Sequence, residues 1–199
     1  MTKLIKILAI LTLLIFITGC EDKPIGKKVV FKSTKDMDPR LKAYPEAVEW
    51  YENSDMDKVS VYNLGVLYQN KIIDYKQAII WYKKALDMGY RKASFGLGNS
   101  YRNLKDYQNA IKYYKLAIER ESLQAIKAIA WLYYEDLKDD IKASAYMLTL
   151  IKYGETKDVI FSFLKEKWNL SDETIKKGYE LQLTMPGLPR RYKGDLNLD

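Results

Sequence analysis

Histidine is absent from the sequence, and Cys20 is its single cysteine. Protein zinc sites are built largely from histidine and cysteine, so a metal site of that kind is excluded. A catalytic triad that depends on histidine and a disulfide within the chain are excluded as well. We also find no nucleophilic side chain with a base beside it. The sequence therefore predicts no catalysis, no metal and no cofactor.

A strong excess of one charge is also missing. The chain has 33 basic and 26 acidic residues, which are interspersed and give a net charge of +7. Removal of residues 1–19 would take away two lysines and no acid, leaving +5. Domains that bind nucleic acid concentrate their positive charge on one face. We therefore expect no nucleic-acid partner.

The sequence has a single long apolar run, over residues 7–17, with Lys3 and Lys6 before it. This run is too short to span a bilayer, which takes about 20 residues, but it suits the core of a secretory signal. Ile17-Thr18-Gly19-Cys20 follows and resembles the lipobox of bacterial lipoproteins. The resemblance implies cleavage after residue 19 and acylation of Cys20. The alternative is an ordinary cleaved signal followed by a chance cysteine.

One pattern occurs three times between residues 60 and 155. Each copy has a large apolar residue, a small residue and then a tyrosine, and later an alanine with an aromatic pair or its remnant behind it. The copies are Leu64-Gly65-x-x-Tyr68 with Ala78 and Trp81-Tyr82, Leu97-Gly98-x-x-Tyr101 with Ala110 and Tyr113-Tyr114, and Ile129-Ala130-x-x-Tyr133 with Ala143 and Tyr146-Met147. Their first residues are spaced by 33 and then 32 positions. Such a period is typical of helical repeat arrays.

The small residues predict how each unit packs. Leu64, Gly65 and Tyr68 share one stripe of a helix, and Ala78 belongs to the matching stripe of a second helix. Glycine inside a helix costs roughly 1 kcal/mol against alanine, so Gly65 and Gly98 indicate close approach of two helices. We expect Gly98→Leu to overpack this contact and Gly98→Ala to be mild.

These motifs resemble the tetratricopeptide repeat and the related Sel1-like repeat. The second copy carries the resemblance best, with Leu97, Gly98, Tyr101, Ala110, Tyr114 and Ala117. The first copy is closer to the Sel1-like form because Gly89 ends it where a helix cap is needed. The third copy departs most, with Ala130 for glycine and Leu150 for alanine. The resemblance implies an all-α, right-handed α-solenoid of about three helix-turn-helix repeats with a capping helix at each end.

The flanking segments complete the expected domain organisation. Residues 1–19 are a lipoprotein signal peptide, 20–39 a flexible tether, 40–184 the repeat domain and 185–199 a disordered or surface-wrapping tail. Residues 41–52 match the second helix of a truncated repeat and would cap the N-terminal end of the array. Residues 156–169 form a further helix, and Ser171 begins the helix that caps the C-terminal end.

The resemblance implies that the first helix of each pair lines a concave binding face. The side chains expected there include aromatics, Arg and Asn, which are typical of protein interfaces. They are Tyr62, Gln69, Asn70, Phe95, Asn99, Arg102, Asn103, Lys127, Trp131 and Tyr134, with Val66 and Glu135 on the same faces. Asn99, Arg102 and Lys127 resemble in part the clamp by which some tetratricopeptide domains hold a terminal carboxylate. The alternative for Phe95 and Trp131 is that they complete the core between repeats.

Two other motifs could carry chemistry. Gly96-Leu97-Gly98 is a GxG motif, but it lies inside a repeat helix with no strand before it, which argues against a nucleotide loop. Glu135, Asp136, Asp139 and Asp140 cluster at a helix-turn boundary, and paired acids can serve a glycosidase. We expect a solvated turn with a capping role instead.

Together these patterns predict a lipid-anchored protein that faces the periplasm and binds another protein without catalysis. Glu21 follows the expected acylated cysteine, and the lipoprotein resemblance then implies the outer rather than the inner membrane. We expect the partner to be a toxin or effector, with this chain as its immunity or inhibitor protein. The main alternative is a scaffold or assembly factor for an envelope complex. A remote alternative is an enzyme that acts on envelope glycan.

Overall fold

The computed structural model describes residues 32–198, and every regular element in this range is a helix or a helical turn. The signal peptide expected over residues 1–19, Cys20 and residues 21–31 lie outside the described range. No helix between residues 32 and 198 has the length and apolarity needed to cross a bilayer. The elements, with η for 3₁₀ and π turns, are η1 (Thr34–Asp36), η2 (Pro39–Ala43), α2 (Pro45–Glu52), α3 (Lys58–Leu67), η3 (Tyr68–Ile72), α4 (Tyr75–Asp87), α5 (Ala93–Asn103), α6 (Tyr107–Ile118), α7 (Leu123–Trp131), η4 (Leu132–Asp136), α8 (Asp140–Thr149), η5 (Leu150–Tyr153), α9 (Lys157–Ser162), η6 (Phe163–Lys167) and α10 (Asp172–Thr184).

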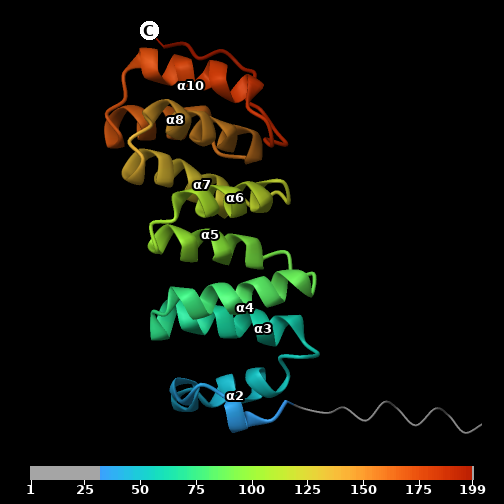
Figure 1. Ribbon diagram of the computed structural model, residues 1–199. Coiled ribbons are helices and arrows are strands. Elements are labelled where there is room, and N and C mark those ends of the chain that lie inside the picture. Colours follow the sequence, from blue (N-terminus) through green and yellow to red (C-terminus); the bar gives the residue numbers. More distant parts are fainter. Residues whose placement is uncertain (1–31, 199) are drawn as a thin grey trace, which may run out of the picture. The chain divides into compact units, whose positions relative to one another are not determined.

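From α2 to α8, each helix packs against the next in chain order (Figure 1). The helices α3 and α4, α5 and α6, and α7 and α8 form the three expected pairs, and α4 packs against α5 and α6 against α7. Contacts restricted to adjacent units define a solenoid. The expected all-α solenoid is therefore confirmed.

A hydrogen bond that closes the turn of each hairpin recurs in the turn between η6 and α10. In the first three hairpins, the N–H of Asp74, Asp106 and Asp139 donates to the carbonyl of the motif tyrosine, Tyr68, Tyr101 and Tyr133, at 2.8, 3.0 and 2.8 Å. The backbone N–H of Leu170 likewise donates to the carbonyl of Leu164 at 3.0 Å. The helix α10 packs against α8 and not against α9. The expected C-terminal cap thus has the same turn as the repeats but a different helix pairing.

The aspartates of the turns are helix caps. The side chains of Asp74, Asp106 and Asp139 accept hydrogen bonds from the backbone N–H groups of Gln77, Asn109 and Lys142, at the first turns of α4, α6 and α8. Each satisfies a donor that an uncapped helix leaves free. This repeated cap explains why an aspartate precedes every motif alanine.

The glycines bring helices together, as the sequence predicts. A Cβ placed on Gly65 would lie 2.6 Å from the ring of Tyr82, and one on Gly98 would contact the ring of Tyr114 more closely still. Both rings are buried. The expectation that Gly98→Ala would be mild is therefore wrong, because even one methyl group meets the Tyr114 ring.

The buried side chains form two core clusters that meet at α5. The N-terminal cluster extends from Met37 to Leu97, and the C-terminal cluster extends from Ala110 to Leu188. Tyr101 and Tyr113, at the junction, stack with their rings 5.5 Å apart. Where the two clusters meet, α5 buries several small residues, namely Ala93, Ser94, Gly96, Gly98 and Ser100. The third copy packs fully despite its departures, since Ala130 and Leu150 are both buried.

Both ends of the folded unit differ from a simple tether and tail. The folded unit starts at Lys32, not at residue 40. Within it η1 forms and Met37 is buried, so the last residues of the expected tether belong to the domain. At the C-terminus Leu188 is buried and Gln182 exchanges two hydrogen bonds with the backbone of Tyr192. Of the two alternatives for the tail, the structure shows a segment that wraps the surface.

Candidate functional site

Seven of the ten candidate binding residues lie on the helices α3, α5 and α7, and Gln69, Asn70 and Tyr134 lie on the π turns η3 and η4 that follow α3 and α7. The seven line three separate pockets, which we call the apolar, the polar and the cationic pocket. Lys127 and Trp131 line the first, Asn99, Arg102 and Asn103 the second, and Tyr62 and Phe95 the third. Gln69, Asn70 and Tyr134 line none of these three. The Gln69 amide oxygen instead accepts a hydrogen bond from the Ser100 hydroxyl at 3.0 Å.

The apolar pocket lies between α7, α8 and α9 and has a volume of about 170 Å³. Val159 is 56% exposed there, a high value for an apolar side chain. The only charged residues that line the pocket, Lys127 and Glu155, form an ion pair at 2.8 Å. Its walls are Lys127, Trp131, Met147, Leu150, Glu155, Val159, Ile160 and Phe163. An apolar centre with a neutralised polar rim is the arrangement found at protein interfaces.

Trp131 is fixed in place by an aromatic cluster. Its ring lies edge-on to Phe163 at 5.8 Å and to Trp168 at 5.2 Å. Trp168 stacks on Tyr134 at 4.3 Å, and the Tyr134 hydroxyl donates to the Trp168 carbonyl. Trp131 therefore both contributes to the packing between hairpins and lines the pocket. Val159 and Phe163 belong to the helix expected over residues 156–169, but sequence reasoning did not assign them to a site, because only packing brings that helix beside α7.

The polar pocket, of about 340 Å³, is lined by groups that already bind one another. Arg102 pairs with Asp136 at 2.6 Å and with Glu135 at 2.7 Å. Burial by itself would lower the pKa of Arg102. The hydrogen bonds to Asp136 and Glu135 outweigh burial, so the pKa of Arg102 is raised overall. The side-chain oxygen of Asn99 accepts a hydrogen bond from the Tyr114 hydroxyl at 2.7 Å. The three residues of the suggested carboxylate clamp thus all have partners within the chain, and Lys127 lies in a different pocket from the other two.

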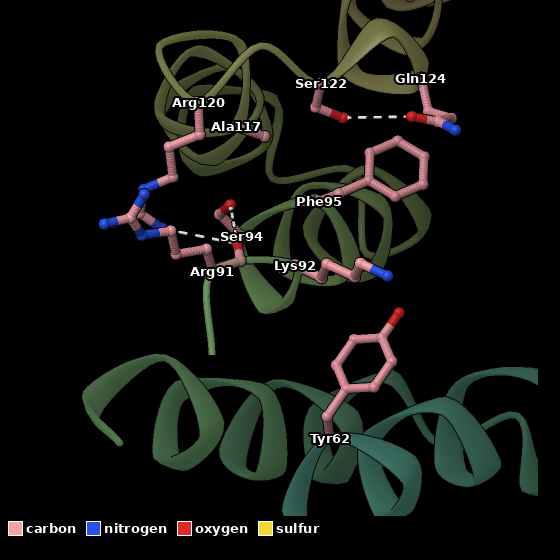
Figure 2. A pocket seen from close by; sticks show the side chains of 9 residues that line it. All are labelled: Tyr62, Arg91, Lys92, Ser94, Phe95, Ala117, Arg120, Ser122 and Gln124. Atoms are coloured by element: carbon pink, nitrogen blue, oxygen red, sulfur yellow. Dashed lines mark hydrogen bonds between the residues drawn. The ribbon is translucent and has the colours of Figure 1, made fainter. Parts of the chain in front are cut away.

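The cationic pocket lies where three hairpins meet and has a volume of about 340 Å³ (Figure 2). Tyr62 of α3 and Phe95 of α5 provide its aromatic side chains. The remaining walls are Arg91, Lys92, Ser94, Ala117, Arg120, Ser122 and Gln124. No acidic residue lines it. Sequence reasoning missed the three cations because they lie in the connections between repeats, outside the helical pattern.

The acidic cluster has structural roles. Glu135 and Asp136 hold Arg102, while Asp139 caps α8 and pairs with Lys142 at 2.6 Å. Between residues 32 and 198, no group of three or more potential ligand residues is placed to hold a metal ion.

Comparison with known proteins supports the repeat assignment. A family model described as tetratricopeptide repeat matches residues 92–122, which contain α5 and α6. Over 147 residues the chain is 31% identical to the "Uncharacterized protein ycf37" of Guillardia theta, an alignment that covers 69% of this chain and 78% of that protein.

Proposed function

Because this chain belongs to the family of ycf37 of Guillardia theta and contains a tetratricopeptide repeat, we propose that it functions by binding another protein through the first helices of its hairpins. Solenoids of this kind offer extended surfaces rather than a single catalytic cleft. The acids that could suggest catalysis are engaged in a cap and in ion pairs. Binding without catalysis is the function that these contacts support best.

The apolar pocket is the observation that carries the proposal. Trp131 is held rigidly by its aromatic neighbours, so little side-chain entropy is lost when a partner packs on it. Val159 is exposed beside it, and both surround a recess that fits one apolar side chain. Interface hot spots have this composition, with an aromatic anchor at the centre and polar groups around it.

We further propose that the protein is held at a membrane by an acylated Cys20 and faces the periplasm, at the outer membrane. The basic start, the apolar run and the lipobox-like residues before Cys20 support this location. Two or three acyl chains would anchor the chain stably, whereas one chain would not. The array would then stand near the membrane surface.

For the partner, we propose a single toxin or effector that this protein inhibits, in preference to a general scaffold role. Standard interfaces bury about 800 Å² on each partner, and an array of this length offers one such surface. One dedicated ligand suits this size better than several. An assembly factor for an envelope complex is the alternative proposal.

Site-specific photo-crosslinking tests the binding face. A benzophenone amino acid at Val159 should yield a covalent adduct with one cellular protein. The same group at Ile80 on α4 is the control, because both residues are 56% exposed and Ile80 lies outside the three pockets. Adducts at Ile80 but not at Val159 would contradict the proposed face, and adducts with many proteins at Val159 would favour the scaffold role.

The anchor is tested separately by Cys20→Ala. This variant should leave the membrane fraction or accumulate with its leader uncleaved, because Cys20 is the sole cysteine available for acylation. Unchanged membrane association would overturn the proposed lipid anchor and leave the binding face unaffected.

A further inference from the structure

The cationic pocket combines positive charge with apolar walls in one recess. Arg91 and Lys92 come from the connection between α4 and α5, and Arg120 comes from the connection between α6 and α7. The Arg120 guanidinium reaches the backbone carbonyl of Arg91 at 3.5 Å, so the two arginines are neighbours in space (Figure 2). In the view of Figure 2, Lys92 lies between Tyr62 and Phe95.

No carboxylate between residues 32 and 198 neutralises the three cations of this pocket. The arginines Arg40, Arg102 and Arg190, in contrast, each pair with at least one carboxylate. Arg91, Lys92 and Arg120 take part in none of the ion pairs formed among residues 32–198. The nearby Glu121 pairs with Arg190 of the C-terminal segment. Positive groups gathered in a recess without a neutralising acid create a local potential that attracts an anion.

The aromatic walls are rigid and partly exposed. Tyr62 packs on Tyr90 at 4.7 Å and on Tyr82 at 5.5 Å, and Phe95 packs on Tyr114 at 6.1 Å. A ligand that fills the pocket would therefore place an apolar group beside its negative charge. A volume of about 340 Å³ lies at the small end of ligand sites, which start near 300 Å³. It accommodates one or two side chains.

We propose that the cationic pocket binds an acidic segment of the partner protein, with a carboxylate at Arg91 and Arg120 and an adjacent apolar side chain against Tyr62 and Phe95. The inference rests on the proposed function, because it names a second contact of the same binding face. Both aromatic residues belong to the first helices, α3 and α5, so one extended peptide can continue from these helices toward α7. A flat membrane surface would not fill a recess between three hairpins, and free phosphate would leave the aromatic walls uncovered.

Fluorescence anisotropy with a labelled decapeptide of alternating Leu and Glu tests this inference on the full 199-residue chain. The peptide should bind saturably, and its affinity should fall as salt rises. Arg91→Gln combined with Arg120→Gln should weaken binding about tenfold or more, because charge-assisted contacts are lost. The control is Lys58→Gln combined with Lys76→Gln, which removes the same charge from exposed positions outside the pocket. It should change affinity less than about twofold.

Three results of the binding assays would overturn the proposal. The first is equal weakening by both double variants, which would indicate non-specific attraction. The second is absence of peptide binding at low salt. The third is binding of inorganic phosphate, or of vesicles containing phosphatidylglycerol, without binding of the peptide. Crosslinking from Val159 separates the two proposals: an adduct that persists in the Arg91/Arg120 variant with unchanged partner affinity refutes only the cationic pocket, whereas absence of adducts from Val159 in the protein without these two substitutions refutes the binding face.

Discussion

Tyr114 shows how tightly single residues are placed in this array. Its ring lies against Gly98, and its hydroxyl is held by Asn99, so it can move neither away from the glycine nor along it. Gly98→Ala should therefore destabilise the protein by about 1–3 kcal/mol, the usual cost of overpacking. Urea unfolding of the variant measures this cost.

The Tyr114→Leu background provides the control for Gly98. A smaller side chain at position 114 leaves room for the added methyl, so Gly98→Ala should cost much less there than in the parent protein. Equal costs in both backgrounds would show that the contact with Tyr114 is not the reason why alanine is disfavoured at position 98.

Asp38 links the N-terminal turns to the first repeat through its charge. The pKa of Asp38 is lowered to about 2, chiefly by hydrogen bonds from the Arg40 side chain, while burial opposes the shift and the Tyr68 hydroxyl assists it. The folded pKa is below the unfolded value of 3.8. The stabilisation is thus complete above about pH 4 and is lost as the pH falls toward 2.

Asp38→Asn should isolate this contribution. The variant should be less stable than the parent at pH 6 by on the order of 1 kcal/mol, since the pair is largely open to solvent. The difference should shrink as the pH falls from 4 to 2, as followed by urea midpoints. A difference that is constant over this range would show that hydrogen-bond geometry, and not charge, makes the contribution.

Among the elements, the turns inside the hairpins carry the least favourable backbone. Ile73, Lys105, Lys138 and Asn169 occupy equivalent positions with φ between 51° and 60°. Left-handed backbone costs a non-glycine residue roughly 1–2 kcal/mol, and a β-branched one is especially disfavoured. Only the turn before α10 uses asparagine, which tolerates this region.

Exchanging the two turn residues tests this strain. Ile73→Asn should stabilise the protein by roughly 0.5–1 kcal/mol, and Asn169→Ile should destabilise it by a similar amount. Ile73 is 57% exposed, so its replacement removes little packing. Thermal melts in which the two changes shift the midpoint in the same direction would contradict the account.

The same elements show which parts of the structure could be predicted from the sequence. The helix pairs were predictable because Leu64, Gly65 and Tyr68 report local periodicity and recur at a fixed spacing. The left-handed turns could not be, because Ile73 and Lys105 do not favour that conformation on their own. Arg102 was assigned to a partner, but the structure pairs it with acids of the next hairpin. Likewise, the cationic pocket depends on which charges remain unpaired after packing, and sequence spacing does not report that.

At the scale of the whole folded unit, the C-terminal segment completes the core of the last hairpin. Leu188 is 4% exposed, although it lies beyond the end of α10. Leu188→Ala should cost about 2–3 kcal/mol, as for other buried leucines. Leu123→Ala, at a 37% exposed position on α7, should change stability by less than about 0.5 kcal/mol. Equal midpoints for the two variants in chemical denaturation would show that the segment is not part of the core.

The position of α5 between the two core clusters has a consequence for how the array opens. This helix packs against both α4 and α6, so an opening that separates the clusters must break its contacts on one side. Repeat arrays can unfold in parts, and such an opening would divide this array into two. The cationic pocket spans this junction, since Tyr62 lies on one side and Gln124 on the other. A ligand seated in it would hold the halves together and raise the free energy of opening in proportion to its occupancy. Recognition would then be measurable as slower proteolysis and slower amide exchange in α5, even where no enzyme activity exists to follow.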